Sequence, residues 1–294
     1  MTQLSPSPLS PSQLSPSPLS PAPGAAGDDA APRLVLPPRP GGRWKPWAVL
    51  GVVLAITAVT MSPGIGIDFS FDAIIRNWRN GADKIAQLLS PDWSFFPRTV
   101  EPVLETLRMA VIATAVGALI SLPISFWSAR LTNPNPVLRG IVRTLLNIIR
   151  SVPELLYAAV LVAMVGVGAL PGILALVLFN VGIIVKLVSE SIETQDPGPS
   201  EAGRAAGASQ TQINRAIALP DAWPAFANQT LYVLELNVRA STVLGLVGAG
   251  GLGLLIDAVR TFYRYDQLSL IILEILVVVL VLDWVSGALR KRLV

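Results

Sequence analysis

The ionisable residues of greatest chemical interest lie inside one of the apolar parts of the chain. Glu235 and Arg239 stand four positions apart, in the order that lets a carboxylate meet a guanidinium on one helix face. A charge in an apolar environment is costly unless it is paired or faces water. The two residues therefore form either an internal ion pair or a site where Arg239 offers its charge to an anion.

Several kinds of chemistry are excluded by composition. The chain has no cysteine and no histidine, which removes thiol chemistry, disulfides, Cys/His metal sites and Ser-His-Asp triads. The phosphate-binding pattern G-x-x-x-x-G-K-[ST] is also absent from the sequence. We therefore expect a protein that is not an enzyme and that holds neither a metal nor a cofactor itself.

The elements that carry these residues are predicted to be membrane helices. Of the 294 residues, 52% are hydrophobic and only 14% are charged, and the mean hydropathy is +0.59. A soluble domain carries about 25% charged residues, so the deficit of charge indicates an integral membrane protein.

Six stretches are apolar enough to cross a bilayer core, which needs about 20 residues of helix. They are residues 46–62, 102–128, 151–169, 172–190, 226–247 and 268–288. Only Pro171-Gly172 separates the third from the fourth, which predicts a tight helical hairpin. The expected fold is therefore all-α, an integral membrane protein with six transmembrane helices.

The placement of positive charge predicts the orientation of the spans. Lysine and arginine concentrate before the first span, between the second and third, and after the sixth, with two more arginines between the fourth and fifth. Such residues favour the cytoplasmic side. We therefore expect both termini, and the segment 194–223, in the cytoplasm of a bacterial cell, with the chain crossing the plasma membrane several times.

Two segments lie outside the spans. Residues 1–44 contain the repeat LSPSP-LSPSQ-LSPSP-LSP and are expected to be a disordered cytoplasmic tail, either a docking segment or a dispensable extension. Residues 45–100 hold the first span and a long outer loop. Within that loop, apolar residues from Ile74 to Leu89 predict a helix on the membrane surface, either an anchor or a binding site. Trp93, Phe95 and Phe96 are expected at headgroup depth.

A spaced pattern occupies the polar segment before the fifth span. It reads Glu201-Ala202-Gly203, three residues, Gly207, nine residues, Ile217, one residue, then Leu219-Pro220. This spacing resembles the EAA motif of ABC importer permeases, with Gly203 where that family usually has Ala. Because Gly has a lower helix propensity, the departure costs about 1 kcal/mol of helix stability.

The resemblance implies that this segment is a coupling helix that docks into a groove of a cytoplasmic ATPase. Glu201 would then cap the helix or form a salt bridge, while Ala202, Gly203 and Gly207 would make the close contact. Gly207 would permit a turn between two short helices, and Pro220 would end the second one. The alternative is an amphipathic loop helix with no partner.

The region 101–294 carries a second resemblance. RSVPELLYAAVL (150–161) and NVRASTVLGLVGAGGLGLLI (237–256) resemble the phosphonate importer permeases, within a broader group that includes methionine permeases. This implies the type I ABC importer permease fold. We expect Glu235, Asn237, Arg239, Ser241 and Thr242 to line the translocation path. The expected gate, for which a simple structural break is the alternative, comprises Gly248, Gly250, Gly251 and Gly253.

The same resemblance implies partners and cargo. A second copy of the chain would complete the path, an ABC ATPase dimer would bind ATP and Mg²⁺, and an extracytoplasmic solute-binding protein would deliver phosphonate, phosphite or phosphate. Membrane lipids are expected around the chain, and no nucleic acid. The alternatives are a permease for another small solute, such as an amino acid, and a stand-alone secondary transporter.

Overall fold

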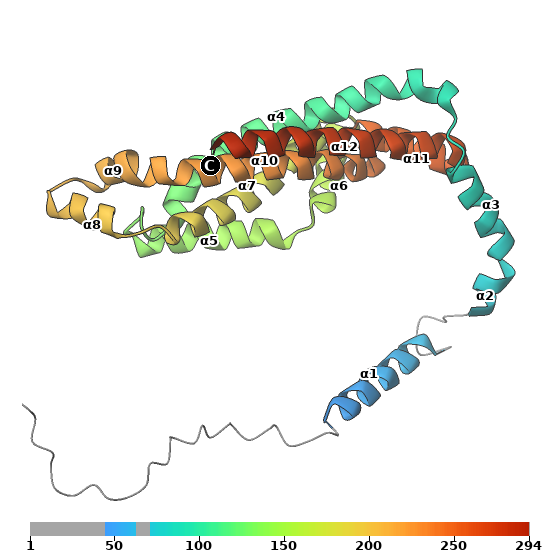
Figure 1. Ribbon diagram of the computed structural model, residues 1–294, viewed down its shortest axis with the longest axis horizontal. Helices are drawn as coiled ribbons and strands as arrows, with labels where there is room; N and C mark the ends of the chain where they lie inside the picture. Colours follow the sequence, from blue (N-terminus) through green and yellow to red (C-terminus); the bar gives the residue numbers. More distant parts are fainter. Residues whose placement is uncertain (1–44, 63–70, 294) are drawn as a thin grey trace, which may run out of the picture. The chain divides into compact units, whose positions relative to one another are not determined.

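The computed structural model describes residues 45–62 and 71–293, and every regular element in these ranges is a helix (Figure 1). This confirms the predicted all-α class. The tail predicted for residues 1–44 lies outside the described residues. The chain divides at Ser70 into two units. In the first, the structure describes one helix, α1 (Lys45–Met61), whose side chains are exposed from Trp47 to Thr60.

The second unit is a helix bundle preceded by two short helices. In chain order its elements are α2 (Phe71–Arg76), α3 (Trp78–Leu88), η2 (Trp93–Phe95), α4 (Phe96–Ser128), α5 (Pro136–Ser151), α6 (Glu154–Val165), α7 (Ala169–Glu193), α8 (Gly198–Ala205), α9 (Gln210–Ile213), η3 (Asn214–Ala218), α10 (Leu219–Leu244), η4 (Gly245–Val247), α11 (Leu252–Thr261) and α12 (Tyr265–Leu293). Helices α8 and α9 lie at one end of the bundle and α11 at the other (Figure 1).

Four described helices are long and apolar enough to cross a membrane, and the predicted count of six stays a prediction. They are Trp93–Ser128, Ala169–Glu193, Gln210–Val247 and Tyr265–Arg292. Helices α5 and α6 pass the same test only together, and they are bent by 84° at the break between them. Helix α1, with 17 residues, is shorter than the four spans.

The predicted hairpin turn at Pro171-Gly172 is wrong. The break lies earlier, where Gly166 and Gly168 adopt φ angles of 98° and 145° between α6 and α7. Pro171 instead fits inside the first turn of α7, where the backbone N–H groups have no helical partner. Gly172 serves close packing, because an added Cβ would lie 2.5 Å from the backbone oxygen of Ala249.

The arginine-rich segment between the second and third predicted spans is also helical. From the sequence we expect a connection between two membrane spans here, whereas the structure has the helix α5. Asn135 caps this helix by accepting the N–H groups of Val137 and Leu138. Leu146 is buried against α7, while Leu145 and Ile148 on the opposite face are exposed. Helix α5 therefore buries one apolar side chain against α7 and leaves further apolar side chains exposed on the face away from it.

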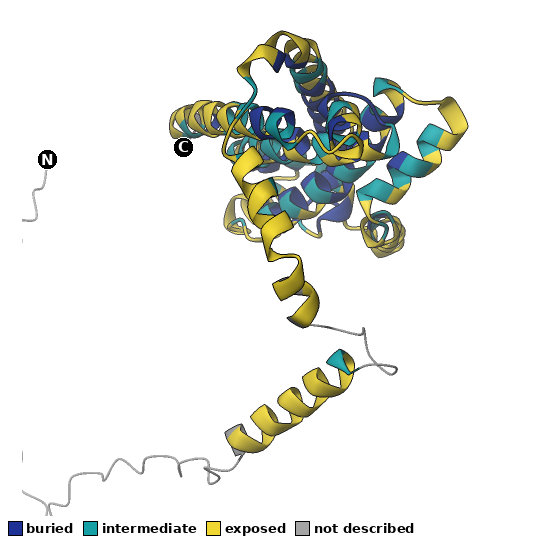
Figure 2. Cartoon of the chain, turned by 90° about the vertical axis from the view of Figure 1, so that its right-hand side faces the viewer, coloured by how far each residue is buried: buried dark blue, intermediate teal, exposed yellow. Residues whose placement is uncertain are grey.

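The centre of the bundle is formed by α4, α7 and α10. Helix α4 turns small residues toward its neighbours, among them Ala110, Ala113 and Ala118. Gly117 belongs to the same face, and an added Cβ there would lie only 2.6 Å from the Cβ of Asn180 on α7. Small residues allow such close approach of membrane helices. In Figure 2 the buried residues gather where these helices face one another.

In the loop after the first predicted span, the structure has two helices, α2 and α3, where the sequence predicts one from Ile74 to Leu89. Helix α3 has no buried residue, and its place on a membrane surface stays a prediction. Trp93 and Phe96 are exposed, and their headgroup depth stays a prediction, whereas Phe95 is only 6% exposed. It packs in a core cluster with Leu252 and Leu270, because η2 turns it toward α11 and α12.

Candidate functional site

The EAA-like pattern forms a helical hairpin at one end of the bundle. Gly207, with φ of 83°, ends α8 by letting its own N–H reach Arg204 O and the N–H of Ala208 reach Gly203 O. This is the paired C-terminal capping arrangement that favours glycine. Ser209 and Gln212 then begin α9 with reciprocal side-chain and backbone hydrogen bonds. Both ends of the turn are thus locally encoded.

The motif residues divide between an exposed and an inward face. Glu201, Ala202 and Gly207 are exposed, and among the described residues Glu201 has no ion-pair partner. Gly203 does not share that face. An added Cβ on Gly203 would lie 3.3 Å from Ile213 and 3.4 Å from Ile217. Gly203 thus lies half-buried against the inside of the hairpin, and its expected contact with a partner protein stays a prediction.

Pro220 does not end a helix. Residues from Gln210 to Val247 form one continuous helical span, with a π-helical segment at Asn214–Ala218 immediately before α10. Proline lacks an N–H and its ring crowds the carbonyl four residues earlier. The wider π turn makes room for Pro220 in the first turn of α10. Leu219, beside it, is half-buried, and Pro220 is exposed.

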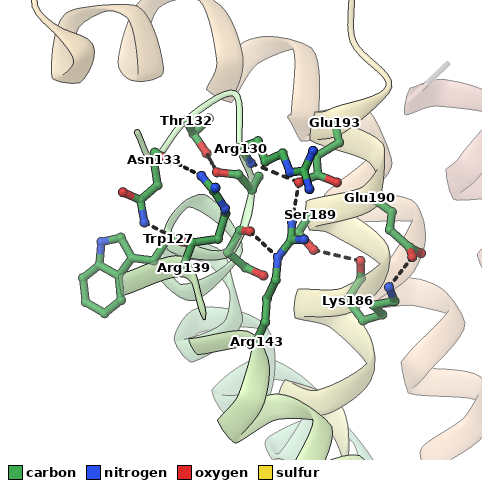
Figure 3. A network of polar contacts seen from close by, with 12 residues as sticks. Trp127, Arg130, Thr132, Asn133, Arg139, Arg143, Lys186, Ser189, Glu190 and Glu193 are labelled. Atoms are coloured by element: carbon green, nitrogen blue, oxygen red, sulfur yellow. Dashed lines mark hydrogen bonds and ion pairs between the residues drawn. The ribbon is translucent and has the colours of Figure 1, made fainter. Parts of the chain in front are cut away.

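A polar network joins the end of α7 to α5 and to the turn between α4 and α5, residues 129–133 (Figure 3). Glu193, the last residue of α7, accepts the backbone N–H of Arg130 at 3.0 Å and forms an ion pair with Arg143 of α5. Arg143 also donates from Nε to Ser128 O at 2.9 Å. Asn133 donates to Trp127 O at 2.7 Å. The network closes the end of α4 against α5 and α7.

The expected path residues on α10 do not share one surface. Asn237 and Ser241 are fully buried, and Asn237 donates its side-chain N–H to Thr114 of α4 at 2.8 Å. They pack inside the chain, which corrects their assignment to an open path. Arg239 is exposed and pairs with Glu235 at 2.5 Å. Thr242 is half-buried and donates to Arg239 O.

The glycine-rich segment lies at the opposite end of the bundle from α8. Gly248, Gly250 and Gly251 all have positive φ angles, which lets the chain reverse between η4 and α11. Gly253 packs closest, since an added Cβ would lie 2.3 Å from Thr242 O. Gly248 O also accepts the N–H of Gly168 at 3.0 Å. The segment therefore meets the break between α6 and α7.

The sequence matches the family described as "Binding-protein-dependent transport system inner membrane component" over residues 121–294. The chain belongs to this family. The phosphite transport system permease protein PtxC of Stutzerimonas stutzeri is 44% identical over 72% of this chain and 79% of that protein. The phosphate-import permease protein PhnE of Mycolicibacterium smegmatis is 40% identical over 65% of this chain and 36% of that protein.

Solved structures show the same permease fold. The methionine ABC transporter MetNI in an inward-facing conformation matches with a TM-score of 0.63 and 24% identity, over 69% of this chain and 99% of that one. A bacterial ABC transporter that imports alginate matches with a TM-score of 0.53 and 14% identity, over 84% and 96% of the two chains. The ABC importer permease fold expected from the motif is therefore confirmed.

Sequence reasoning missed the residues that tie the hairpin to the bundle. Gln210 and Asn214 donate side-chain N–H groups to Leu131 O at 3.2 Å and to Thr132 O at 2.8 Å. The acceptors are backbone atoms, which carry no sequence signal. The only hint is Asn214 itself, an amide on a helix whose neighbour Ile213 is buried.

Proposed function

We propose that this permease is the membrane subunit of an ATP-driven importer of phosphonate or a related phosphorus oxyanion. The observation that carries the proposal is the 44% identity to a phosphite permease over most of both chains. A second phosphite permease protein of S. stutzeri, described as putative, is 36% identical over 70% of this chain. Relatives for phosphite and phosphate support one tetrahedral class of cargo, and the solute-binding protein would choose among its members.

We propose that the exposed face of the α8–α9 hairpin docks into a cytoplasmic ATPase. Glu201, Ala202 and Gly207 form this face, and Ala205 and Ala206 extend it with further small side chains. Small residues let another surface approach the helix closely. Ile217 and Leu219 support it from behind, and Pro220 fixes the start of α10. This assignment puts the hairpin end of the bundle on the cytoplasmic side, the side where the placement of positive charge in the sequence predicts both termini.

The remaining partners follow from this role. Two permease copies would enclose the path, and a solute-binding protein would dock outside. Among the described residues, no group of three or more Asp, Glu, His or Cys side chains stands where it would hold a metal. We assign ATP and Mg²⁺ to the partner ATPase. The permease would then move the cargo by changing its own conformation, without altering the cargo chemically.

On the path, we propose that Arg239 presents its charge to the passing anion. Its side chain is 54% exposed although it pairs with Glu235, whose side chain is 15% exposed. Because Glu235 is largely buried and an exchange would leave it unpaired, the anion would meet the other N–H groups, on the exposed side of the Arg239 guanidinium, while the ion pair is kept. The positive-φ glycines between η4 and α11 are the proposed gate.

Uptake by the assembled importer tests the function. The permease is expressed with its partner ATPase and solute-binding protein, and uptake of labelled phosphite, phosphate and methylphosphonate is compared with uptake of methionine. ATP-dependent uptake of a phosphorus oxyanion is expected. Uptake of methionine alone would reassign the cargo, and uptake that persists without any ATPase would indicate a secondary transporter.

Docking is tested by copurification of the ATPase with tagged permease. Glu201→Arg reverses the charge on the exposed face and is expected to lose the ATPase. Asp83→Arg makes the same change on α3, which belongs to a different part of the bundle and has no buried residue, and should keep it. Equal recovery with both variants would contradict the docking assignment.

A further inference from the structure

The turn between α4 and α5 is stiffened by its own side chains. Thr132 Oγ1 donates to Phe126 O at 2.7 Å, and Asn133 Nδ2 donates to Trp127 O at 2.7 Å. Ser128 O accepts from Arg143. The last carbonyls of α4, which a helix end leaves without partners, are thus satisfied. Asn133 O in turn accepts from Arg139 Nη1 of α5 at 3.0 Å. Because these bonds hold residues 129–133 to both flanking helices, a displacement of the turn must displace α4 and α5 with it.

One side of this turn is held by the segment that leads into α8. Glu193 ends α7, and α8 begins at Gly198, after the four residues 194–197. Its carboxylate accepts the N–H of Arg130 and pairs with Arg143, whose side chain is 38% exposed. A charge-assisted hydrogen bond in a half-buried position is about twice as strong as a neutral one. The entrance to the hairpin is therefore fixed to the turn.

The other side of the turn is held by the segment that leaves α8. Asn214 Nδ2 donates to Thr132 O at 2.8 Å, and Gln210 Nε2 donates to Leu131 O at 3.2 Å. Gln210 Nε2 also donates to Asn214 Oδ1 at 2.8 Å, which orients the second amide. The exit from the hairpin is therefore fixed to the same five-residue turn as its entrance.

Helix α8 itself packs against α9 and η3, through Gly203 on Ile213 and Ile217. A movement of the exposed face of α8 is therefore transmitted to the rest of the protein through the entrance to the hairpin and through its exit. Both ends carry hydrogen bonds to residues 129–133. Besides the covalent path into α10, these bonds therefore connect the hairpin to α4, a helix of 33 residues that runs through the centre of the bundle.

We propose that the turn at residues 129–133 receives the movement of the hairpin and passes it to α4 and α5. Glu193 and Asn214 are the positioning residues of this relay. The inference rests on the proposed function, since it presumes an ATPase that moves α8. It adds a specific element to that function: two side chains outside the exposed docking face that determine how much transport each ATP hydrolysis produces.

The test measures uptake and ATP hydrolysis in the same proteoliposomes, with the complete importer and its binding protein. Asn214→Asp keeps the shape of the side chain but replaces the donor to Thr132 O by an acceptor. Gln212→Ala is the control, because it removes the α9 cap in the same hairpin without touching the turn. Copurification and thermal stability of each complex are recorded beside the two rates.

For Asn214→Asp we expect the ATPase to stay bound and to hydrolyse ATP, while uptake per ATP falls about fivefold, the factor of a typical hydrogen bond. Asn214→Gln should restore part of that ratio by returning the donor. A merely structural bond would lower uptake and hydrolysis together. That result, or the same fall with Gln212→Ala, would overturn the relay. Failure of wild-type uptake or docking would instead overturn the proposed function itself.

Discussion

Asn214 donates its side-chain amide to the backbone oxygen of Thr132 across 2.8 Å, joining residues that are 82 positions apart in the sequence. Thr132 is buried and Asn214 half-buried, so water competes little for this bond. Gln210 bonds both to Asn214 and to the neighbouring carbonyl of Leu131. The two amides form one unit, and their contributions to stability should be coupled.

A double-mutant cycle measures that coupling. Gln210→Ala and Asn214→Ala should each lower the free energy of unfolding by about 1 kcal/mol. The double variant should lose less than the sum, by about 0.5 kcal/mol or more, because either change alone already breaks the bond between them. Thermal unfolding of the detergent-solubilised permease provides the measurement. Strict additivity would show that the two amides act separately.

Gly117→Ala should destabilise the bundle, because its Cβ would lie 2.6 Å from the Cβ of Asn180. We expect a loss of about 1–3 kcal/mol, the usual cost of overpacking. Gly140→Ala is the matched control on α5, where an added Cβ meets nothing within 4 Å. That substitution should stabilise by up to about 1 kcal/mol through helix propensity. Opposite shifts in melting temperature would establish the packing of α4 on α7.

Gly207→Ala tests the backbone of the hairpin turn. Its φ of 83° is unfavourable for an L-residue, so we expect a cost of about 1–2 kcal/mol. Because the added methyl group meets nothing within 4 Å, the loss is conformational and not steric. Limited proteolysis between α8 and α9 should accelerate. Gly81→Ala, which lies in α3 and is equally open, should leave cleavage at the hairpin unchanged.

Arg239→Gln should lower the uptake of phosphorus oxyanion about tenfold or more while the importer still assembles, if the charge meets the anion as proposed. Arg239→Lys retains the charge and should recover much of the uptake. Glu235→Gln removes the competing carboxylate and should not reduce uptake. Near wild-type uptake with Arg239→Gln would leave the arginine with only the ion pair to Glu235.

From the pKa of Asp92 we predict that the local structure around Trp93, at the other end of the bundle from the hairpin, depends on pH. Its hydrogen bond from the Ser94 hydroxyl, at 2.6 Å, is the main cause that lowers its pKa below the ordinary 3.8. A lowered pKa in the folded state means that the bond stabilises fully above that ordinary value and is lost as the pH falls through the folded pKa. Trp93 fluorescence should report this local loss in acid. Asp92→Asn should weaken the pH dependence of the signal.

The sequence predicted some parts of this fold well because their signals are local. The spacing of residues 201–220 resembles a known motif, and that resemblance implied two short helices with a turn at Gly207, where glycine tolerates the positive φ. Apolar runs identified α4, α7 and α12. In each case the deciding physics involves residues close together in the chain.

The errors have a common cause in tertiary context. Pro171-Gly172 predicts a turn, yet both residues lie in the first turn of α7, where proline is tolerated. Gly172 is needed there because Ala249 leaves no room for a side chain. Asn237 reads as a path residue, yet Thr114 on α4 supplies a buried partner. Whether a polar or small residue faces the core or the surface depends on its neighbours in the folded protein, and the sequence alone does not identify those neighbours.

The π-helical segment Asn214–Ala218 also sets the angular phase between α9 and α10. A π turn takes in one residue more than an α turn, and one residue corresponds to about 100° of rotation about a helix axis. Deleting a single residue there would therefore swing the exposed face of α8 about a quarter turn around α10 and keep every side chain of that face. The orientation of the hairpin about the α10 axis thus depends on the number of residues in this segment. Insertions and deletions change that number, and substitutions do not.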